Sequence, residues 1–155
     1  MDIQIAQTIL ELLRMNTHVK SIIWWVLYLA MVIGLVYGTP KALSYILQSE
    51  YPMAAITSRS MWPTLKKGDM VFIKGIASRE EIEIGDIVVY QNLQGFTIHR
   101  VERKNEGTVV TKGDANNTED SPVKYEDIIG KTVTFREKPV RIPWLGNVSI
   151  ALDKK

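Results

Sequence analysis

Three kinds of side chain in this sequence could together cleave an amide bond. Ser58 and Ser60 lie in the stretch SRSMWPTL, and His99 lies in the strand-like run TIHRV. An imidazole can take a proton from a serine hydroxyl near neutral pH, because its ordinary pKa is about 6.5, and a carboxylate usually orients the ring. Three carboxylates follow in the loop KGDANNTEDSP: Asp114, Glu119 and Asp120. These residue types alone are a weak signal, since a single histidine in a strand is more often structural than catalytic.

The elements that must position these residues begin with an apolar segment. Residues 21–38 have the sequence SIIWWVLYLAMVIGLVYG, without a charge, and Thr39 and Pro40 extend this run to Lys41. About 20 residues at 1.5 Å each span roughly 30 Å, the thickness of the hydrocarbon core of a bilayer. We therefore predict one uncleaved transmembrane helix at 21–44. A buried core helix is the alternative, and a cleaved signal peptide would have a shorter apolar run.

The charges that flank the apolar segment predict its orientation. Arg14 and Lys20 precede it and Lys41 follows it, which is a weak positive-inside bias. This bias favours an N-terminus in the cytoplasm and residues 45–155 outside it. Of the two histidines, only His99 would then lie in the extracytoplasmic part.

Residues 1–20 form a separate short segment before the anchor. Within it, the stretch IQIAQTILELLRM has apolar residues at near-helical spacing: Ile5, Ile9, Leu12 and Leu13. We predict an amphipathic helix on the cytoplasmic face of the membrane. A helical extension of the anchor fits the same pattern equally well.

After the anchor the pattern changes to short runs that alternate or are rich in β-branched residues. These runs are residues 70–76, 86–92, 96–103, 107–113 and 128–137. Gly-Asp pairs, which are typical of turns, lie beside three of them, at 68–69, 85–86 and 113–114. We predict that residues 45–155 form a small, largely antiparallel β domain, a partly open barrel, so that the fold is mostly β.

Composition argues against several classes of function. The net charge of +2, without a dense basic run, argues against nucleic-acid binding. The absence of cysteine removes disulfides, thiolate metal sites and a cysteine nucleophile. The sequence has no cluster with metal-ligand spacing and no phosphate-binding loop, so we expect no metal and no cofactor.

Four motifs in order, SRSMWPTLKKGD, GDIVVY, IHRV and KGDANNTEDS, resemble membrane-bound signal peptidase I, a family that removes signal peptides from secreted and membrane preproteins. The resemblance covers most of the chain, from the apolar segment to about Gly146. The common bacterial branch has a lysine at the position of His99, and an arginine at the position of Pro122. The sequence therefore resembles the archaeal and endoplasmic-reticulum branch, in which serine, histidine and aspartate replace a serine–lysine dyad.

The resemblance implies a role for each serine. Ser60 would be the nucleophile, and its N–H group together with the Ser58 hydroxyl would form an oxyanion hole, in which one donor is worth about 3 kcal/mol. Met61 and Pro63 would fix the backbone after Ser60, because proline restricts its own φ and the residue before it. An ordinary turn hydroxyl is the alternative for Ser58.

The same resemblance makes His99 the general base and assigns two aspartates. Asp120 would orient the imidazole, and Asp114 would support the loop and the site. Only one of them can accept the Nδ1–H of His99 directly; we favour Asp120, with Asp114 as the alternative. Lys112 is the fallback base, although the neighbouring charge of Asp114 favours its charged form.

The implied substrate is a signal peptide with small side chains at the first and third positions before the cut. Residues 53–58, MAAITS, would be an edge strand on which the substrate backbone pairs, with Ile56, Thr57 and Met61 in contact with it. A simple core strand is the alternative. The implied partners are signal-peptide-bearing preproteins, the lipid bilayer of the cell membrane or endoplasmic reticulum, and a secretion translocon or other complex subunits, without nucleic acid.

Two other functions compete with this one. A catalytically inactive, membrane-anchored β domain could serve as a binding or scaffold module, and it would be favoured if Ser60 proved dispensable. A soluble self-cleaving repressor would have a similar β core and a serine–lysine dyad. The apolar segment and His99 argue against the repressor.

Overall fold

The computed structural model describes residues 4, 5, 7, 16–93 and 95–152. The chain divides into two compact units, Met1–Ala42 and Leu43–Lys155. The amphipathic segment predicted at 1–20 lies mostly outside the described residues.

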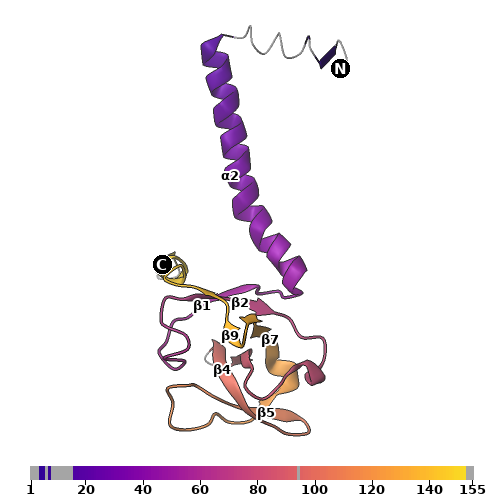
Figure 1. The fold of residues 1–155 in the computed structure, drawn as a ribbon, viewed down its shortest axis with the longest axis vertical. Coiled ribbons are helices and arrows are strands. Elements are labelled where there is room, and N and C mark those ends of the chain that lie inside the picture. The colour runs from indigo at the N-terminus through magenta and orange to yellow at the C-terminus, as the bar shows by residue number, and fades with distance from the viewer. Residues whose placement is uncertain (1–3, 6, 8–15, 94, 153–155) are drawn as a thin grey trace. The chain divides into compact units, whose positions relative to one another are not determined.

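One long helix, α2 (Thr17–Leu47), contains the predicted anchor (Figure 1). It begins after Asn16, whose side-chain oxygen accepts a hydrogen bond from the His18 N–H at 3.2 Å, as an N-cap residue does. It ends before Gln48, which has a left-handed φ of 49°. None of its residues is buried, and its most apolar stretch has a mean hydropathy of 2.1. By length and composition, α2 is therefore a candidate membrane-spanning helix.

Antiparallel strands are the main secondary structure of the second unit, as predicted (Figure 1). The strands are β1 (Met53–Ala55), β2 (Met70–Lys74), β3 (Ile87–Asn92), β4 (Gly95–Lys104), β5 (Thr108–Lys112), β6 (Val123–Lys124), β7 (Ile128–Thr132), β8 (Thr134–Phe135), β9 (Lys138–Pro139) and β10 (Arg141–Ile142). The main sheet has the order β1-β2-β7-β3-β4-β5-β6, with β10 also paired to β2. Its two end strands, β1 and β6, are not neighbours in this order, so the sheet is open, which confirms the predicted fold class.

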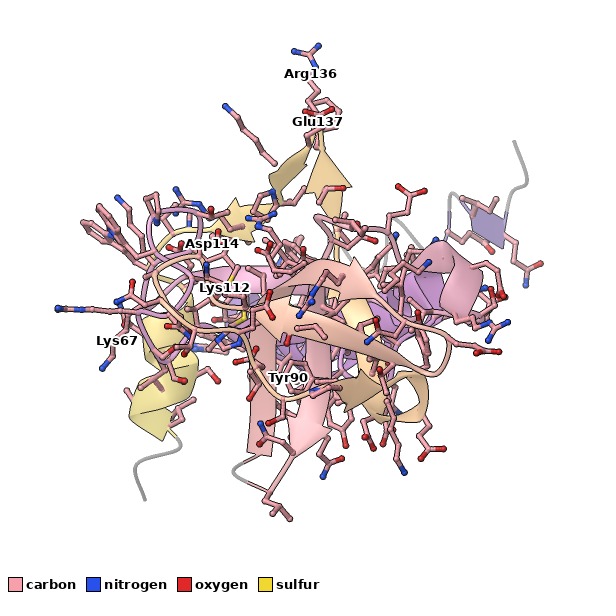
Figure 2. All side chains as sticks on the ribbon, turned by 90° about the horizontal axis from the view of Figure 1, so that it is seen from below. Lys67, Tyr90, Lys112, Asp114, Arg136 and Glu137 are labelled. Atoms are coloured by element: carbon pink, nitrogen blue, oxygen red, sulfur yellow. The ribbon has the colours of Figure 1, made fainter. Side chains whose placement is uncertain are left out.

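Three short helical elements complete the described part of this unit. They are the 3₁₀ turns η1 (Arg79–Glu81) and η2 (Tyr125–Asp127) and the helix α3 (Gly146–Leu152). The prediction of a single strand at 128–137 was wrong. Two residues with left-handed φ, Arg136 (50°) and Glu137 (63°), form a tight turn between β8 and β9, and Figure 2 shows them at the tip of this hairpin.

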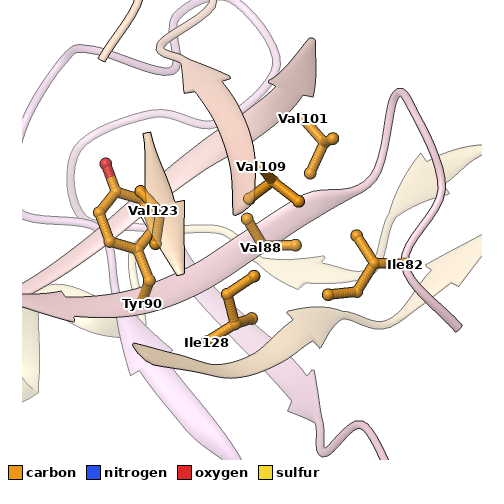
Figure 3. Packing of buried hydrophobic residues seen from close by; sticks show 7 residues of the cluster. All are labelled: Ile82, Val88, Tyr90, Val101, Val109, Val123 and Ile128. Carbon is orange, nitrogen blue, oxygen red and sulfur yellow. The ribbon is translucent and has the colours of Figure 1, made fainter. Parts of the chain in front are cut away.

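Two hydrophobic clusters hold the strands together. The first joins side chains of β3, β4 and β5 with those of neighbouring segments (Figure 3): Ile82, Val88, Tyr90, Val101, Val109, Val123 and Ile128. The second lies beside the serine segment and consists of Ile56, Met61, Leu65, Val71 and Ile87. Ile87 and Val88, adjacent on β3, belong to different clusters, because successive side chains of a strand point to opposite faces.

The C-terminal segment, residues 141–146, contacts the turn at Asp69, which in turn is bonded to the segment before the serines. Arg141 of β10 pairs with the buried carboxylate of Asp69 at 2.7 Å. Gly146 packs so closely on the Asp69 carbonyl that an added Cβ would lie 2.5 Å from it. The Asp69 carbonyl also accepts a hydrogen bond from the Ile56 N–H at 2.9 Å. The position of residues 56–60 therefore depends on the C-terminal segment.

Candidate active site

Ser60 lies at the start of a turn that is fixed by buried neighbours. Met61 is 1% exposed and Leu65 is fully buried, and the Leu65 N–H donates to the Met61 carbonyl at 2.8 Å. Trp62, between them, is 58% exposed and does not belong to either cluster. Burial of the side chains on one side of the turn thus leaves Ser60 partly accessible.

The two serines face each other at short range. Ser58 Oγ lies 3.0 Å from Ser60 Oγ, and the Ser60 N–H donates to Ser58 Oγ at 3.4 Å. The Ser58 hydroxyl and the Ser60 N–H therefore both lie next to Ser60 Oγ. A hydroxyl and a backbone N–H are donor types that form oxyanion holes.

His99 is paired with an aspartate. It lies in β4 opposite Val88 of β3, and it is 8% exposed. Its Nδ1 is 2.6 Å from Asp120 Oδ2. An ionised carboxylate only accepts hydrogen bonds, so this contact favours the neutral tautomer with its proton on Nδ1, in which Nε2 has a lone pair that can accept a proton.

Two hydroxyl groups that the sequence did not single out also contact Asp120. Thr111 Oγ1 donates to Asp120 Oδ2 at 2.6 Å, and Tyr90 Oη donates to the same oxygen at 3.2 Å. Burial, together with the charge of Asp120, raises the pKa of Tyr90 above its ordinary value, so the phenol stays a donor. The available signal was a threonine within the apolar strand run TVVTK, where a buried hydroxyl needs a partner.

The second aspartate has a different partner. Asp114 accepts two hydrogen bonds from Arg100, at 2.9 Å from Nε and 2.8 Å from Nη2. Burial alone would raise the pKa of Asp114, but hydrogen bonds from Arg100 and Thr64 and the charge of Arg100 outweigh it and hold the pKa below its usual value. Arg100 also donates to the Gly85 carbonyl at 2.8 Å, so it joins two turns to the sheet.

The Gly113-Asp114 turn is in direct contact with the serine backbone. The Ala115 N–H donates to the Ser60 carbonyl at 2.8 Å. At Gly113, an added Cβ would lie 2.7 Å from the same carbonyl oxygen. Lys112, just before this turn, is opposite Arg100 in the β4–β5 ladder, and Figure 2 labels it beside Asp114.

Ser60 and His99 line one cleft of about 710 Å³. The residues predicted to contact substrate, Ile56, Thr57 and Met61, line it too, as does Ser58. One wall comes from β1 and the residues after it, and another from the first half of β4, Phe96 to His99. Lys112, Asp114 and Asp120 are not among the described residues that line this cleft. Asp120 nevertheless contacts His99, from outside the cleft.

No group of three or more histidine, aspartate or glutamate side chains is arranged to hold a metal ion within the described part of the chain. Ser60, His99 and Asp120 supply a hydroxyl, an imidazole and a carboxylate, which are the three groups of a serine-peptidase triad.

Comparison with known proteins gives consistent matches. The sequence model of the Peptidase S24-like family matches residues 39–133. A protein of Sclerotinia sclerotiorum named signal peptidase complex catalytic subunit sec11 is 33% identical over 144 residues, covering 83% of this chain and 80% of the relative. The protein of that name from Colletotrichum graminicola is 32% identical over 140 residues, covering 81% and 77%. A third, from Pyrenophora tritici-repentis, is 32% identical over 146 residues, covering 83% and 79%.

Proposed function

This chain belongs to the Peptidase S24-like family and, within it, to the signal peptidases, which are serine peptidases, and on this basis we propose that it removes N-terminal signal peptides from secreted and membrane preproteins. The observation that supports the proposal most is the 2.6 Å contact between His99 and Asp120, with His99 lining the same cleft as Ser60. A scaffold module would not need a carboxylate-paired imidazole in the same cleft as an accessible serine.

In the proposed reaction, Ser60 Oγ attacks the carbonyl carbon of the scissile peptide bond. His99 Nε2 takes the serine proton and later gives it to the leaving amine, while Asp120 stabilises the imidazolium through Nδ1–H. Water, activated in the same way, then hydrolyses the acyl-enzyme and releases Ser60. The short Nδ1–Oδ2 distance supports this division of roles.

The negative charge on the carbonyl oxygen would be met by two donors, the Ser60 N–H and the Ser58 hydroxyl. The Ser60 N–H reaches Ser58 Oγ only over a long 3.4 Å bond, and the Ser58 hydroxyl lies 3.0 Å from Ser60 Oγ, so both donors are next to the proposed nucleophile. Asp114 would act at a distance: through Arg100 and the Ala115–Ser60 backbone bond it holds the loop against the nucleophile.

The substrate would lie as an extended strand in the cleft. β1 is at the end of the sheet order, so no described strand pairs with its outer edge. In the described part of the chain, β5 pairs with Arg100 to Lys104 of β4 and leaves the first half of β4 without a strand on that side. Ile56, Thr57 and Met61, which line the cleft, would contact the side chains before the cut, and close contact there would favour small ones.

We propose that the β domain lies outside the cytoplasm and that a single membrane-spanning helix, α2, anchors it. The flanking charges, Arg14 and Lys20 against Lys41, support an N-terminus in the cytoplasm. The relatives are named as catalytic subunits of a signal peptidase complex, which supports assembly of this chain with other subunits. Protease protection of sealed vesicles tests the orientation: protection of the N-terminus but not of the β domain from the cytoplasmic side would contradict it.

The activity is tested with the full chain in detergent and a radiolabelled preprotein. Wild type should release the signal peptide at its junction, and Ser60→Ala should abolish release while the chain still folds. Ser78→Ala, which changes an exposed serine away from the cleft, is the matched control and should cleave normally. Cleavage at the wild-type rate by Ser60→Ala would overturn the proposed nucleophile, and a folded wild type without any cleavage would favour the scaffold function.

A further inference from the structure

The Asp120 carboxylate receives hydrogen bonds from two buried hydroxyl groups that take no part in the proposed proton transfer. Thr111, which is 0% exposed, and Tyr90, which is 4% exposed, both donate to Oδ2, the oxygen that also accepts from His99. We propose that Thr111 and Tyr90 are positioning residues that hold this oxygen in line with the imidazole. The inference rests on the proposed function, since it assigns these residues to the same reaction.

Thr111 holds Asp120 at two points. Its hydroxyl donates to Oδ2 at 2.6 Å, and its backbone carbonyl accepts the Asp120 N–H at 2.8 Å. The two bonds fix both the backbone position and the side-chain direction of a residue that otherwise belongs to a loop. A side-chain rotation that moved Oδ2 away from His99 would break the bonds from Thr111 and Tyr90 as well.

Asp120 needs such a restraint because solvent reaches it through a second cleft. Its side chain is 23% exposed and, with Tyr90, lines a second cleft of about 770 Å³. Water in that cleft can compete for a carboxylate, which prefers full solvation to a single partner. Three donors on one oxygen favour the orientation toward His99 over the hydrated one.

A hydroxyl at position 111 is otherwise costly. Thr111 follows Val109 and Val110 on β5 and lies opposite Val101 on β4, all of them buried. A valine there would have nearly the same shape and no polar atom to desolvate. The bond to Asp120, supported by the 3.3 Å contact with Tyr90 Oη, is therefore the specific gain that a threonine brings.

The experiment measures kcat and KM for preprotein cleavage by the full chain in detergent. A hydrogen bond to a charged group is worth a factor of roughly 10 or more, so Thr111→Val should lower kcat by roughly tenfold or more with KM unchanged. Thr111→Ser keeps the hydroxyl and should keep most of the rate. Tyr90→Phe, which loses the longer bond, should lose less than Thr111→Val. Thr108→Val, on the same strand, is the matched control and should resemble wild type.

Several outcomes would overturn the inference. A folded Thr111→Val with wild-type kcat would do so, as would Thr111→Ser being as slow as Thr111→Val, because the hydroxyl would then not matter. If Thr111→Val does not fold, an unchanged kcat in Tyr90→Phe overturns it. The failure of the proposed function looks different: wild type would not cleave, or Ser60→Ala would still cleave, and the positioning role would then fall with it.

Discussion

Replacing Asp120 with asparagine removes the charge of this side chain while keeping its shape. His99, Thr111 and Tyr90 all donate to the same oxygen. An amide oxygen in that place could accept the same three bonds, whereas an amide NH₂ there would face three donors. We therefore expect the oxygen of Asp120→Asn to remain beside His99, the proton to stay on Nδ1, and only the negative charge to be lost.

The size of the effect follows from that charge. In the proposed reaction His99 becomes an imidazolium when it takes the Ser60 proton, and two opposite unit charges about 4 Å apart gain about 4 kcal/mol at an effective dielectric constant near 20. At about 1.4 kcal/mol per factor of ten, the loss in kcat should be roughly 10³-fold. If the amide NH₂ faced the ring instead, the wrong tautomer would form and the loss would approach the roughly 10⁴-fold found for one such triad.

The assay is single-substrate cleavage in detergent, with kcat, KM and melting temperature measured for each variant. Asp120→Asn should keep KM and the melting temperature near those of wild type. Glu119→Gln, which changes the adjacent carboxylate in the same loop, is the matched control, because that carboxylate is paired with Arg103 at the surface. A folded and inactive Asp114→Asn beside a nearly normal Asp120→Asn would refute the reasoning, since the two aspartates would then have exchanged roles.

Two further predictions concern the loop next to the nucleophile. Because the fold lowers the pKa of Asp114, its ionised form stabilises the protein above about pH 4, and this stabilisation is lost as the pH falls below that value. The melting temperature of Asp114→Asn should therefore change less than that of wild type between about pH 6 and pH 3. An equal slope in the two proteins would contradict the role of the Arg100 pair. Gly113→Ala should lower the free energy of unfolding by about 1–3 kcal/mol and slow cleavage, because its Cβ would press on the Ser60 carbonyl. Gly107→Ala, where nothing lies within 4 Å, is the control and should do neither. Equal effects of the two substitutions in denaturant titrations would argue against the close contact.

Much of the fold could be predicted from the sequence because local pattern decides it. The alternation and β-branched composition of 70–76, 86–92, 96–103 and 107–113 correspond to β2, β3, β4 and β5 within a few residues. The prediction of one strand at 128–137 was wrong because the composition of this run stays β-like while the chain bends between β7 and β8. The first part of the run, β7, pairs with β2 and β3, whereas β8 pairs with β9, and this tertiary pairing divides the run.

The hydroxyl partners of Asp120 could not be predicted, because they depend on register. Thr111 lies opposite Val101, but the pairing of β4 with β5 shifts between Val101 and Arg103, where an extra residue interrupts the ladder. A bulge of one residue reverses which side chains of β5 face the histidine side. No local signal in the sequence fixes the position of such a bulge, so Thr111, although visible as a polar residue in an apolar run, could not be assigned to Asp120 in advance.

The choice between the two aspartates, in contrast, has a simple physical basis in the dipeptide His99-Arg100. Neighbouring residues of a strand point to opposite faces, so the imidazole and the guanidinium cannot serve the same carboxylate. Arg100, always charged and with a planar fork of donors, binds Asp114 with two hydrogen bonds, and Asp120 is the carboxylate on the face of His99. The strand alternation thus separates two tasks that the loop residues alone leave interchangeable: one aspartate fixes the turn against Ser60, and the other can respond to the protonation of the imidazole.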